Sequence, residues 1–231
     1  MAHCDNLVHV HRAAGDGGVG RRTEETSVNR RTIVLAVAAW QAFVQDIAKA
    51  LSDQALAELH LLQSARVLPA VVQHWKAEFD QAVHKFATPD PAKSRALWKH
   101  FGFDPRPKWT WQQRGGQGNK TVMVEPKHVD EVIEQWLRVR HAVAHGHANL
   151  PALPVLSAVR DPNASARAKT SPNLRLTDAI DCMCFFRSVA RITADAAARH
   201  VQAAAPAWRK DATLALGLHI SNIVTGAFAK A

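Results

Sequence analysis

Apolar side chains recur at alternating intervals of four and three residues along much of the chain, which is the spacing of one face of an α-helix. The clearest stretch runs from 29 to 51, and it follows Thr23 and two acidic residues that favour a helix start. These apolar positions form a narrow stripe along one side of the helix, which suits packing in a helical bundle. The apolar positions are Ile33, Val37, Trp40, Val44, Ile47 and Leu51. Ser52 and Asp53 favour a break, so we expect a separate short helix after them.

Three more stretches are predicted to be helical. One begins near Pro69, with its apolar seam ending before Pro89. A short one runs from 95 to 101 and is closed by Gly102. Another starts at Thr177, and its seam repeats the same three–four spacing. The apolar stripe of each helix must be buried against that of another helix. The sequence therefore predicts an all-α, mostly antiparallel helical bundle.

The chain divides into three regions. Residues 1–22 are polar and rich in glycine, and we expect them to be disordered. Residues 23–204 are expected to form the bundle. Residues 205–231 carry a last amphipathic helix, expected from 211 to 228, which packs on the bundle or on a partner chain.

Two irregular segments interrupt the helices. Residues 104–125 contain RGGQGN, which favours a turn and predicts a small hairpin. Trp109 and Trp111 in this segment either form a platform for RNA bases or pack on the core. We favour packing, because tryptophan is most often buried. Residues 147–174 hold several prolines and small polar residues, which predicts a long surface loop.

Composition narrows the possible partners and compartment. The chain has 231 residues with a net charge of +9, which favours an anionic partner such as nucleic acid. Its three cysteines lack the spacing of a disulfide framework, which indicates a reducing, cytoplasmic compartment. We find no apolar run of membrane-spanning length and no signal peptide, so no membrane association is expected.

The densest chemistry lies at the end of a helix expected to begin at Pro126 and to stop at Gly146. The basic residues of this segment, RVRHAVAHGH, are Arg138, Arg140, His141, His145 and His147. Arginine binds phosphate with paired hydrogen bonds, and histidine transfers protons near neutral pH. A plainer interpretation is a solvated basic helix end that matches the helix dipole.

Arg140 and His145 are five residues apart, which is about 140° around an ideal helix. They can act on one group only if the helix unwinds near Gly146, or if two copies of the helix meet across a symmetry axis. A second arginine–histidine pair at the same spacing, Arg95 and His100, lacks this context, and we interpret it as chance.

The segment QWLRVRHAVAHG resembles the signature of the HEPN superfamily, a group of small all-α domains. The likeness covers about Asn29–Arg191 and includes the first long helix, KWTWQQ and RLTDAIDCMCFFRSV, which resemble the RiboL-PSP-type bacterial branch. It implies that Arg140 and His145 cleave RNA and that His141 orients them. Family members often carry a carboxylate near Gln41, and this chain has no charge there.

The resemblance implies a metal-independent RNA endonuclease that acts as a homodimer, as a toxin or in phage defence beside a neutralising partner protein. We expect Arg138, His147 and Lys127 to bind substrate, and we expect no metal and no cofactor. In one branch a partner nucleotidyltransferase modifies a tyrosine two residues after the motif histidine; this chain has His147 there and contains no tyrosine. The alternative is a non-catalytic domain that binds RNA, a nucleotide or a protein.

Overall fold

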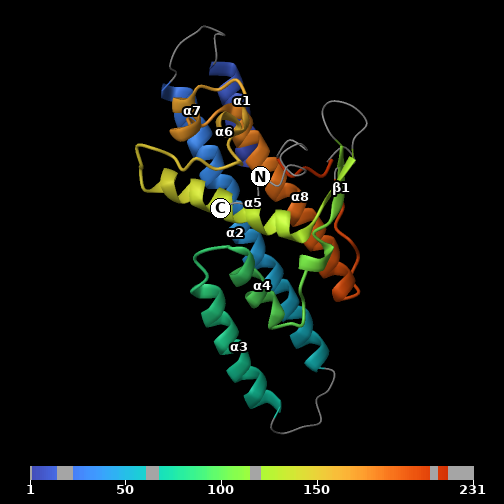
Figure 1. Ribbon diagram of the computed structural model, residues 1–231. Helices are drawn as coiled ribbons and strands as arrows, with labels where there is room; N and C mark the ends of the chain where they lie inside the picture. Colours follow the sequence, from blue (N-terminus) through green and yellow to red (C-terminus); the bar gives the residue numbers. More distant parts are fainter. Residues whose placement is uncertain (1, 15–22, 61–67, 115–120, 209–212, 218–231) are drawn as a thin grey trace.

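Helices make up most of the fold, which confirms the all-α class. The computed structural model describes residues 2–14, 23–60, 68–114, 121–208 and 213–217 (Figure 1). Its elements in chain order are α1 (Ala2–Ala14), α2 (Thr23–His60), α3 (Leu68–His84), α4 (Pro91–Lys99), the 3₁₀ turn η1 (Arg106–Lys108), β1 (Trp111–Arg114), β2 (Thr121–Val124), α5 (Pro126–Ala144), α6 (Ser157–Arg160), α7 (Ala166–Thr170) and α8 (Leu176–His200).

Helices α2 and α8 lie side by side and run in the same direction (Figure 1). Trp40 stacks on Phe186 with ring centroids 5.7 Å apart, and further along both helices Leu51 and Val201 line one cavity. We predicted a mostly antiparallel bundle, and this central pair of helices is parallel. A three–four seam fixes which face of a helix is buried but not the direction of its neighbour.

Helix α3 runs antiparallel to α2, as predicted for neighbours in the bundle. The side-chain amide of Gln41 donates to the carbonyl of Phe86 at 3.0 Å, and that of Gln45 donates to the carbonyl of Val83 at 3.1 Å. The later residue of α2, Gln45, thus pairs with the earlier residue Val83, which shows that the two helices run in opposite directions. These bonds also satisfy carbonyls near the end of α3 that have no partner within the helix.

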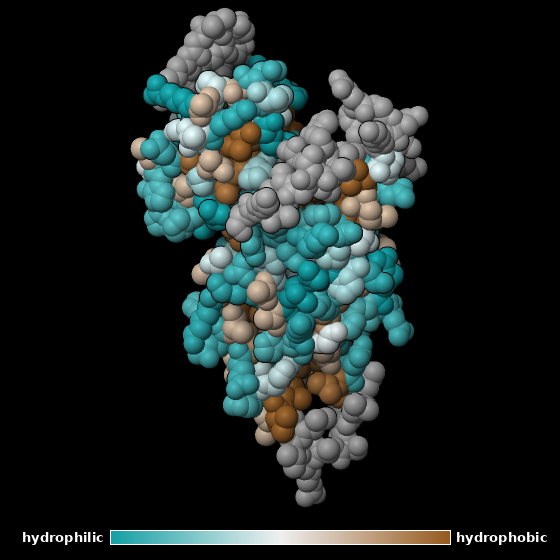
Figure 2. All heavy atoms as spheres, viewed as in Figure 1, coloured by the Kyte–Doolittle hydropathy of each residue, from teal (hydrophilic) through white to brown (hydrophobic). Residues whose placement is uncertain are grey.

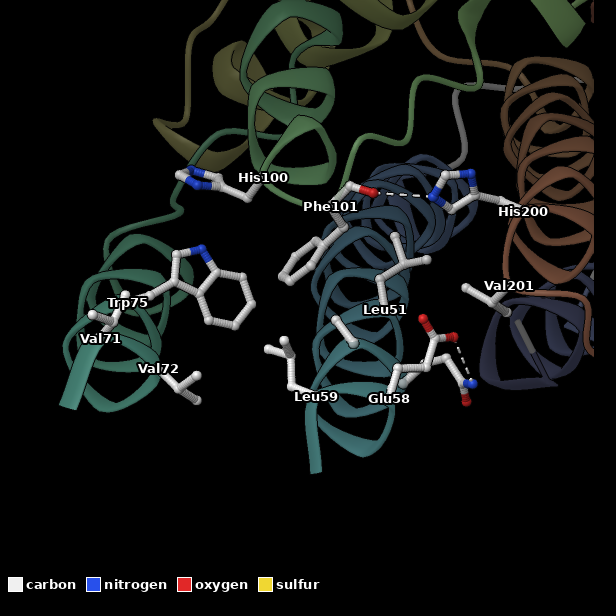
Figure 3. Close-up of a pocket in the computed structure, with 12 residues that line it drawn as sticks. Leu51, Glu58, Leu59, Val71, Val72, Trp75, His100, Phe101, His200 and Val201 are labelled. Carbon is white, nitrogen blue, oxygen red and sulfur yellow. Dashed lines mark hydrogen bonds between the residues drawn. The ribbon is translucent and has the colours of Figure 1, made fainter. Parts of the chain in front are cut away.

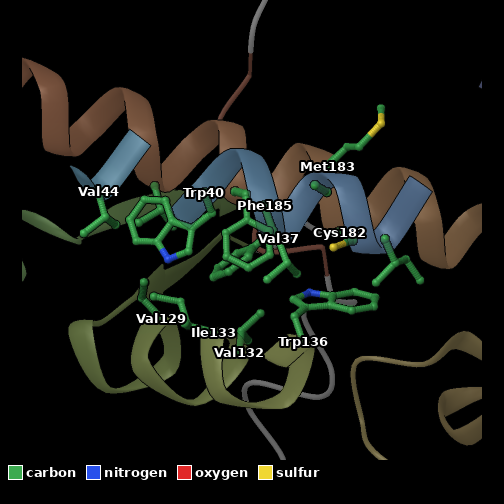
Figure 4. Packing of buried hydrophobic residues seen from close by; sticks show 14 of the residues in the cluster. Val37, Trp40, Val44, Val129, Val132, Ile133, Trp136, Cys182, Met183 and Phe185 are labelled. Carbon is green, nitrogen blue, oxygen red and sulfur yellow. The ribbon is translucent and has the colours of Figure 1, made fainter. Parts of the chain in front are cut away.

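The core lies where α5 crosses α2 and α8 (Figures 1 and 4). Ile133 and Trp136 of α5 face Val37 and Trp40 of α2, and all four are at most 1% exposed. Phe185 of α8 closes the cluster. Burying each such side chain contributes about 1.5–3 kcal/mol, so this crossing holds α5 in place.

Helix α2 is continuous from Thr23 to His60, so the break predicted at Ser52 and Asp53 is wrong. Ser52 is buried at 4% exposed, and packing overrides its local preference. By length and apolar content, the stretch Thr26–Leu59 would also suffice to cross a membrane, which differs from our sequence expectation. In this fold its apolar seam forms the contacts with α5 and α8.

Residues 2–14 form helix α1, which corrects the prediction that residues 1–22 are disordered; residues 15–22 lie outside the described part. Cys4 and Val8, one turn apart, are buried against the core. Asp5 forms an ion pair with Arg187 of α8 at 2.9 Å. Two buried residues give too weak a periodic signal to predict a helix, and contacts with α2 and α8 stabilise it.

The predicted hairpin is confirmed, with β1 and β2 antiparallel and Trp111 opposite Val124. Trp109 is fully buried and its indole N–H donates to Thr193 Oγ1 of α8 at 3.0 Å. Trp111 is 6% exposed. Both tryptophans therefore pack on the core, as we favoured, and neither offers a face for stacking RNA bases.

The segment 147–174 is more ordered than the predicted surface loop. It contains α6 and α7, and its buried apolar residues are Leu150, Leu153, Val155, Leu156, Ala158 and Leu174. Asp178, fully buried at the start of α8, accepts hydrogen bonds from the backbone N–H groups of Ser157 and Arg175 at 2.6 and 2.7 Å. Arg160 pairs with Asp181 at 2.9 Å, so this loop arginine is not available for an RNA phosphate.

Residues 213–217 show irregular backbone where we predicted part of a C-terminal helix from 211 to 228; the rest of that range lies outside the described residues. The Leu216 side chain is fully buried, and its backbone N–H donates to Gln113 of β1 at 2.8 Å. This short segment therefore joins the hairpin to α8, where the Ala215 N–H donates to Ser188 Oγ.

The close approach of this segment to α8 gives a test. Gly217 has φ +71°, and a Cβ there would lie 2.8 Å from the carbonyl oxygen of Asp181. We expect Gly217→Ala to lower the free energy of unfolding by about 2–5 kcal/mol, from backbone strain and overlap together. Urea denaturation measures the change.

The control is Gly102→Ala, where φ is +66° but nothing lies within 4 Å of the added Cβ. That variant has only the backbone cost, about 1–2 kcal/mol. Equal losses in the two variants would show that the contact with Asp181 does not contribute.

Candidate active site

Helix α5 carries the candidate site at its C-terminal end. It begins at Pro126, as predicted, and its last turn closes at Gly146, which adopts φ +65°. The backbone N–H of His147 donates to the carbonyl of Ala142 at 2.9 Å, which folds the chain back over the helix end. A left-handed residue just past the helix is the usual place for glycine.

Three imidazoles cluster at this end. The ring centroids of His141 and His145 are 4.2 Å apart, and His147 lies 6.2 Å from each. All three residues are exposed, and within the described residues their ring nitrogens have no hydrogen-bond partner. None of the three faces the core of its own chain, so each can reach a ligand from solvent.

The two arginines of the motif point in different directions. Arg138 is exposed, and it lies about 20° from His145 and 60° from His141 around the helix. Arg140 is half-buried on the side of Trp136, and its Nε is buried without a partner among the described residues. Within one chain, Arg138 is therefore the arginine on the same side of the helix as His141 and His145.

Two other residues of the sequence hypothesis lie away from this cluster. Lys127 is at the opposite end of α5, about 27 Å from His145 at the helical rise per residue, and it pairs with Glu125 at 2.7 Å. The structure therefore does not place Lys127 with the other substrate-binding candidates. Gln41 binds the Phe86 carbonyl and ties α2 to the chain after α3.

The Arg95–His100 spacing has a structural explanation. Arg95 donates two hydrogen bonds to the carboxylate of Asp104, at 2.9 and 2.6 Å. The Arg95 hydrogen bond is also the main reason that the pKa of Asp104 is lowered. This bidentate pair joins α4 to the segment before η1, which agrees with our interpretation that the repeat of the spacing is chance.

Helix α5 also carries a half-buried acid, Glu131, with an unusual pKa. Burial raises the pKa of Glu131 from its ordinary 4.5 to about 7, the charge of Glu134 adds to this, and a hydrogen bond from Gln135 opposes it. Gln135 in turn accepts from the Val155 N–H at 3.1 Å. The segment after the motif is thus held to the helix that bears the imidazoles.

A cavity of about 440 Å³ opens between the C-terminal ends of α2, α4 and α8 and the N-terminal part of α3 (Figure 3). Trp75, Phe101 and Leu59 line it, and Figure 2 shows apolar atoms at this end of the molecule. Its acid, Glu58, is already hydrogen-bonded to Gln54. Sequence reasoning missed this cavity, because its lining comes from four separate segments and no local pattern marks it.

The cavity also holds His100 and His200, but among the described residues the imidazoles that contact one another are those at the end of α5. Among the described residues, no group of three or more His, Cys, Asp or Glu side chains is arranged to hold a metal ion. Comparison of the chain with protein-family models, with curated proteins and with solved structures finds no match.

Glu131 predicts a dependence of stability on pH. The folded protein retains a proton there that the unfolded chain releases near pH 4.5, so this contribution is present below that pH and is lost as pH rises to about 7. We expect Glu131→Gln to abolish this loss and to raise the melting temperature at pH 8 relative to wild type.

Thermal melts between pH 5 and pH 8 provide the measurement, with Asp80→Asn, an exposed carboxylate on α3, as the control. The assignment is wrong if Glu131→Gln and Asp80→Asn change the slope of melting temperature against pH equally.

Proposed function

We propose that the protein is a metal-independent endoribonuclease whose active site is the end of α5. The observation that supports this most is the exposed cluster of His141, His145 and His147, with two arginines in the same turns. The net charge of +9 agrees with an RNA substrate.

The reaction needs an internal nucleophile and proton transfer. The ribose 2′-hydroxyl attacks the adjacent phosphorus, His145 takes its proton, and an arginine stabilises negative charge on the phosphate oxygens. His141, in contact with His145, orients that ring. Arg138 is placed to bind phosphate because it shares the exposed face with both imidazoles.

A homodimer would allow Arg140 to act on the same phosphate as His145. In one chain Arg140 and His145 are about 140° apart around the helix, so a second α5 across a twofold axis is needed for both to reach one cleft. Trp136 is fully buried in the core of its own chain and is not available for such an interface. The exposed acid Glu134 precedes the basic residues, so two antiparallel copies of this face set acids opposite bases.

The resemblance to HEPN nucleases further favours a cytoplasmic toxin or defence enzyme restrained by a partner protein. Tyrosine modification is unavailable to this chain, which has none. Restraint then depends on a partner that covers the imidazole cluster, or on modification of another residue.

The alternative is a non-catalytic RNA-binding domain. It is favoured by Arg140, which is half-buried and about 140° from His145 around the helix of a single chain. It is also favoured by Gln41, which is bound to Phe86 and carries no charge. In that case the same basic face holds a phosphate without cleaving it.

Cleavage assays separate the two. We expect the pure protein to cut RNA in EDTA, to leave 2′,3′-cyclic phosphate ends, and to spare DNA of the same sequence. His145→Ala should lower the rate about 10²–10⁴-fold, because it removes a proton-transfer group. Gel analysis of end-labelled RNA measures both results.

His100→Ala is the matched control, an exposed histidine remote from the motif, and it should retain activity. Cleavage that EDTA abolishes would contradict the metal-independent mechanism. Binding of RNA without any cleavage would favour the non-catalytic alternative.

Light scattering tests the assembly. We expect a dimer at micromolar concentration, and we expect Glu134→Lys to shift it toward monomer, because like charges then oppose one another across the axis. Asp80→Lys, a charge reversal on α3, should leave the dimer intact. A monomeric wild-type protein would count against the shared cleft.

A further inference from the structure

His147 occupies a fixed position beside the motif histidines, although it lies outside the helix. Gly146 at φ +65° reverses the chain, and the His147 N–H is held by the Ala142 carbonyl at 2.9 Å. The imidazole consequently sits 6.2 Å from both other rings, whereas those two are in contact at 4.2 Å. The cluster is therefore one close pair of rings, tilted by 49° to one another, with a third ring set apart from it.

This spacing matters for transesterification at phosphorus. The attacking and leaving oxygens lie on opposite sides of the phosphorus, roughly in line. A base and an acid must each come within about 2.6–3.2 Å of their own oxygen. Two imidazoles in contact, such as His141 and His145, lie on one side of a phosphate. A ring set apart from them can serve the opposite oxygen.

We propose that His147 is the general acid of the reaction and that His145 is the base, so that one chain supplies both proton transfers. This rests on the proposed endoribonuclease function. His145 takes the proton of the 2′-hydroxyl as the bond from 2′-oxygen to phosphorus forms. The bond from phosphorus to the 5′-oxygen breaks, and the His147 imidazolium gives its proton to that oxygen.

The products are a 2′,3′-cyclic phosphate and a free 5′-hydroxyl, and one proton has moved from His147 to RNA while His145 has gained one. Both rings are exposed, so exchange with water restores their starting states. In this assignment His147 has a role beyond the substrate binding expected from the sequence, and Arg138 on the same face is left to bind phosphate.

The role of the general acid can be tested separately with a substrate whose leaving group departs without being protonated. In a ribonucleoside 3′-(4-nitrophenyl phosphate) the departing nitrophenolate is stable as an anion, while attack by the 2′-hydroxyl still needs the base. We expect His147→Ala to cut RNA about 10²–10⁴-fold more slowly and to retain activity within about threefold of wild type on the aryl ester. His145→Ala should lose activity on both.

The comparison of substrates excludes a merely structural role, because a misfolded or weakly binding variant loses both activities. His100→Ala is again the control and should match wild type on both substrates. Equal losses on RNA and aryl ester in His147→Ala, or no loss on either, overturn the assignment while the endoribonuclease proposal stands. A wild-type protein that cleaves neither substrate overturns both.

Discussion

Packing of the apolar face of α5 against α2 and α8 is the constraint on which the rest of the site depends. Ile133 and Trp136 are fully buried in that contact, and they fix the rotation of the helix about its axis. Since the opposite face must then meet solvent, Arg138, His141 and His145 are exposed together. The placement of the chemical groups is a consequence of burial on the other side of the same helix.

The same rotation separates the arginines. Arg140 falls near the buried side, where its Nε is enclosed without a partner in the described chain, while Arg138 joins the imidazoles. The arginine and the histidine of the motif, which are five residues apart, thus lie on two different sides of one helix. The glycine turn at Gly146 then adds His147 to the exposed surface, which gives the end of α5 a third imidazole at a distance from the other two.

Most helices could be predicted from the sequence because periodic burial and local start and stop signals agree. Pro126 and Gly146 bound α5 as expected, and β1 and β2 pair as the expected hairpin. Prediction failed where packing overrode local preference. Buried Ser52 does not break α2, and Cys4 and Val8 anchor a helix in a segment with few buried residues.

By itself, the sequence determined the all-α class, the two ends of the motif helix, and the presence of arginine and histidine in its last turns, since each depends on residues close in the chain. Only the tertiary structure decided that α2 and α8 run in the same direction, that Lys127 pairs with Glu125, and that Arg138 is exposed while Arg140 is half-buried. The physical reason is that periodicity shows which residues are buried, but the neighbour that buries them comes from distant parts of the chain, and its orientation leaves no local pattern.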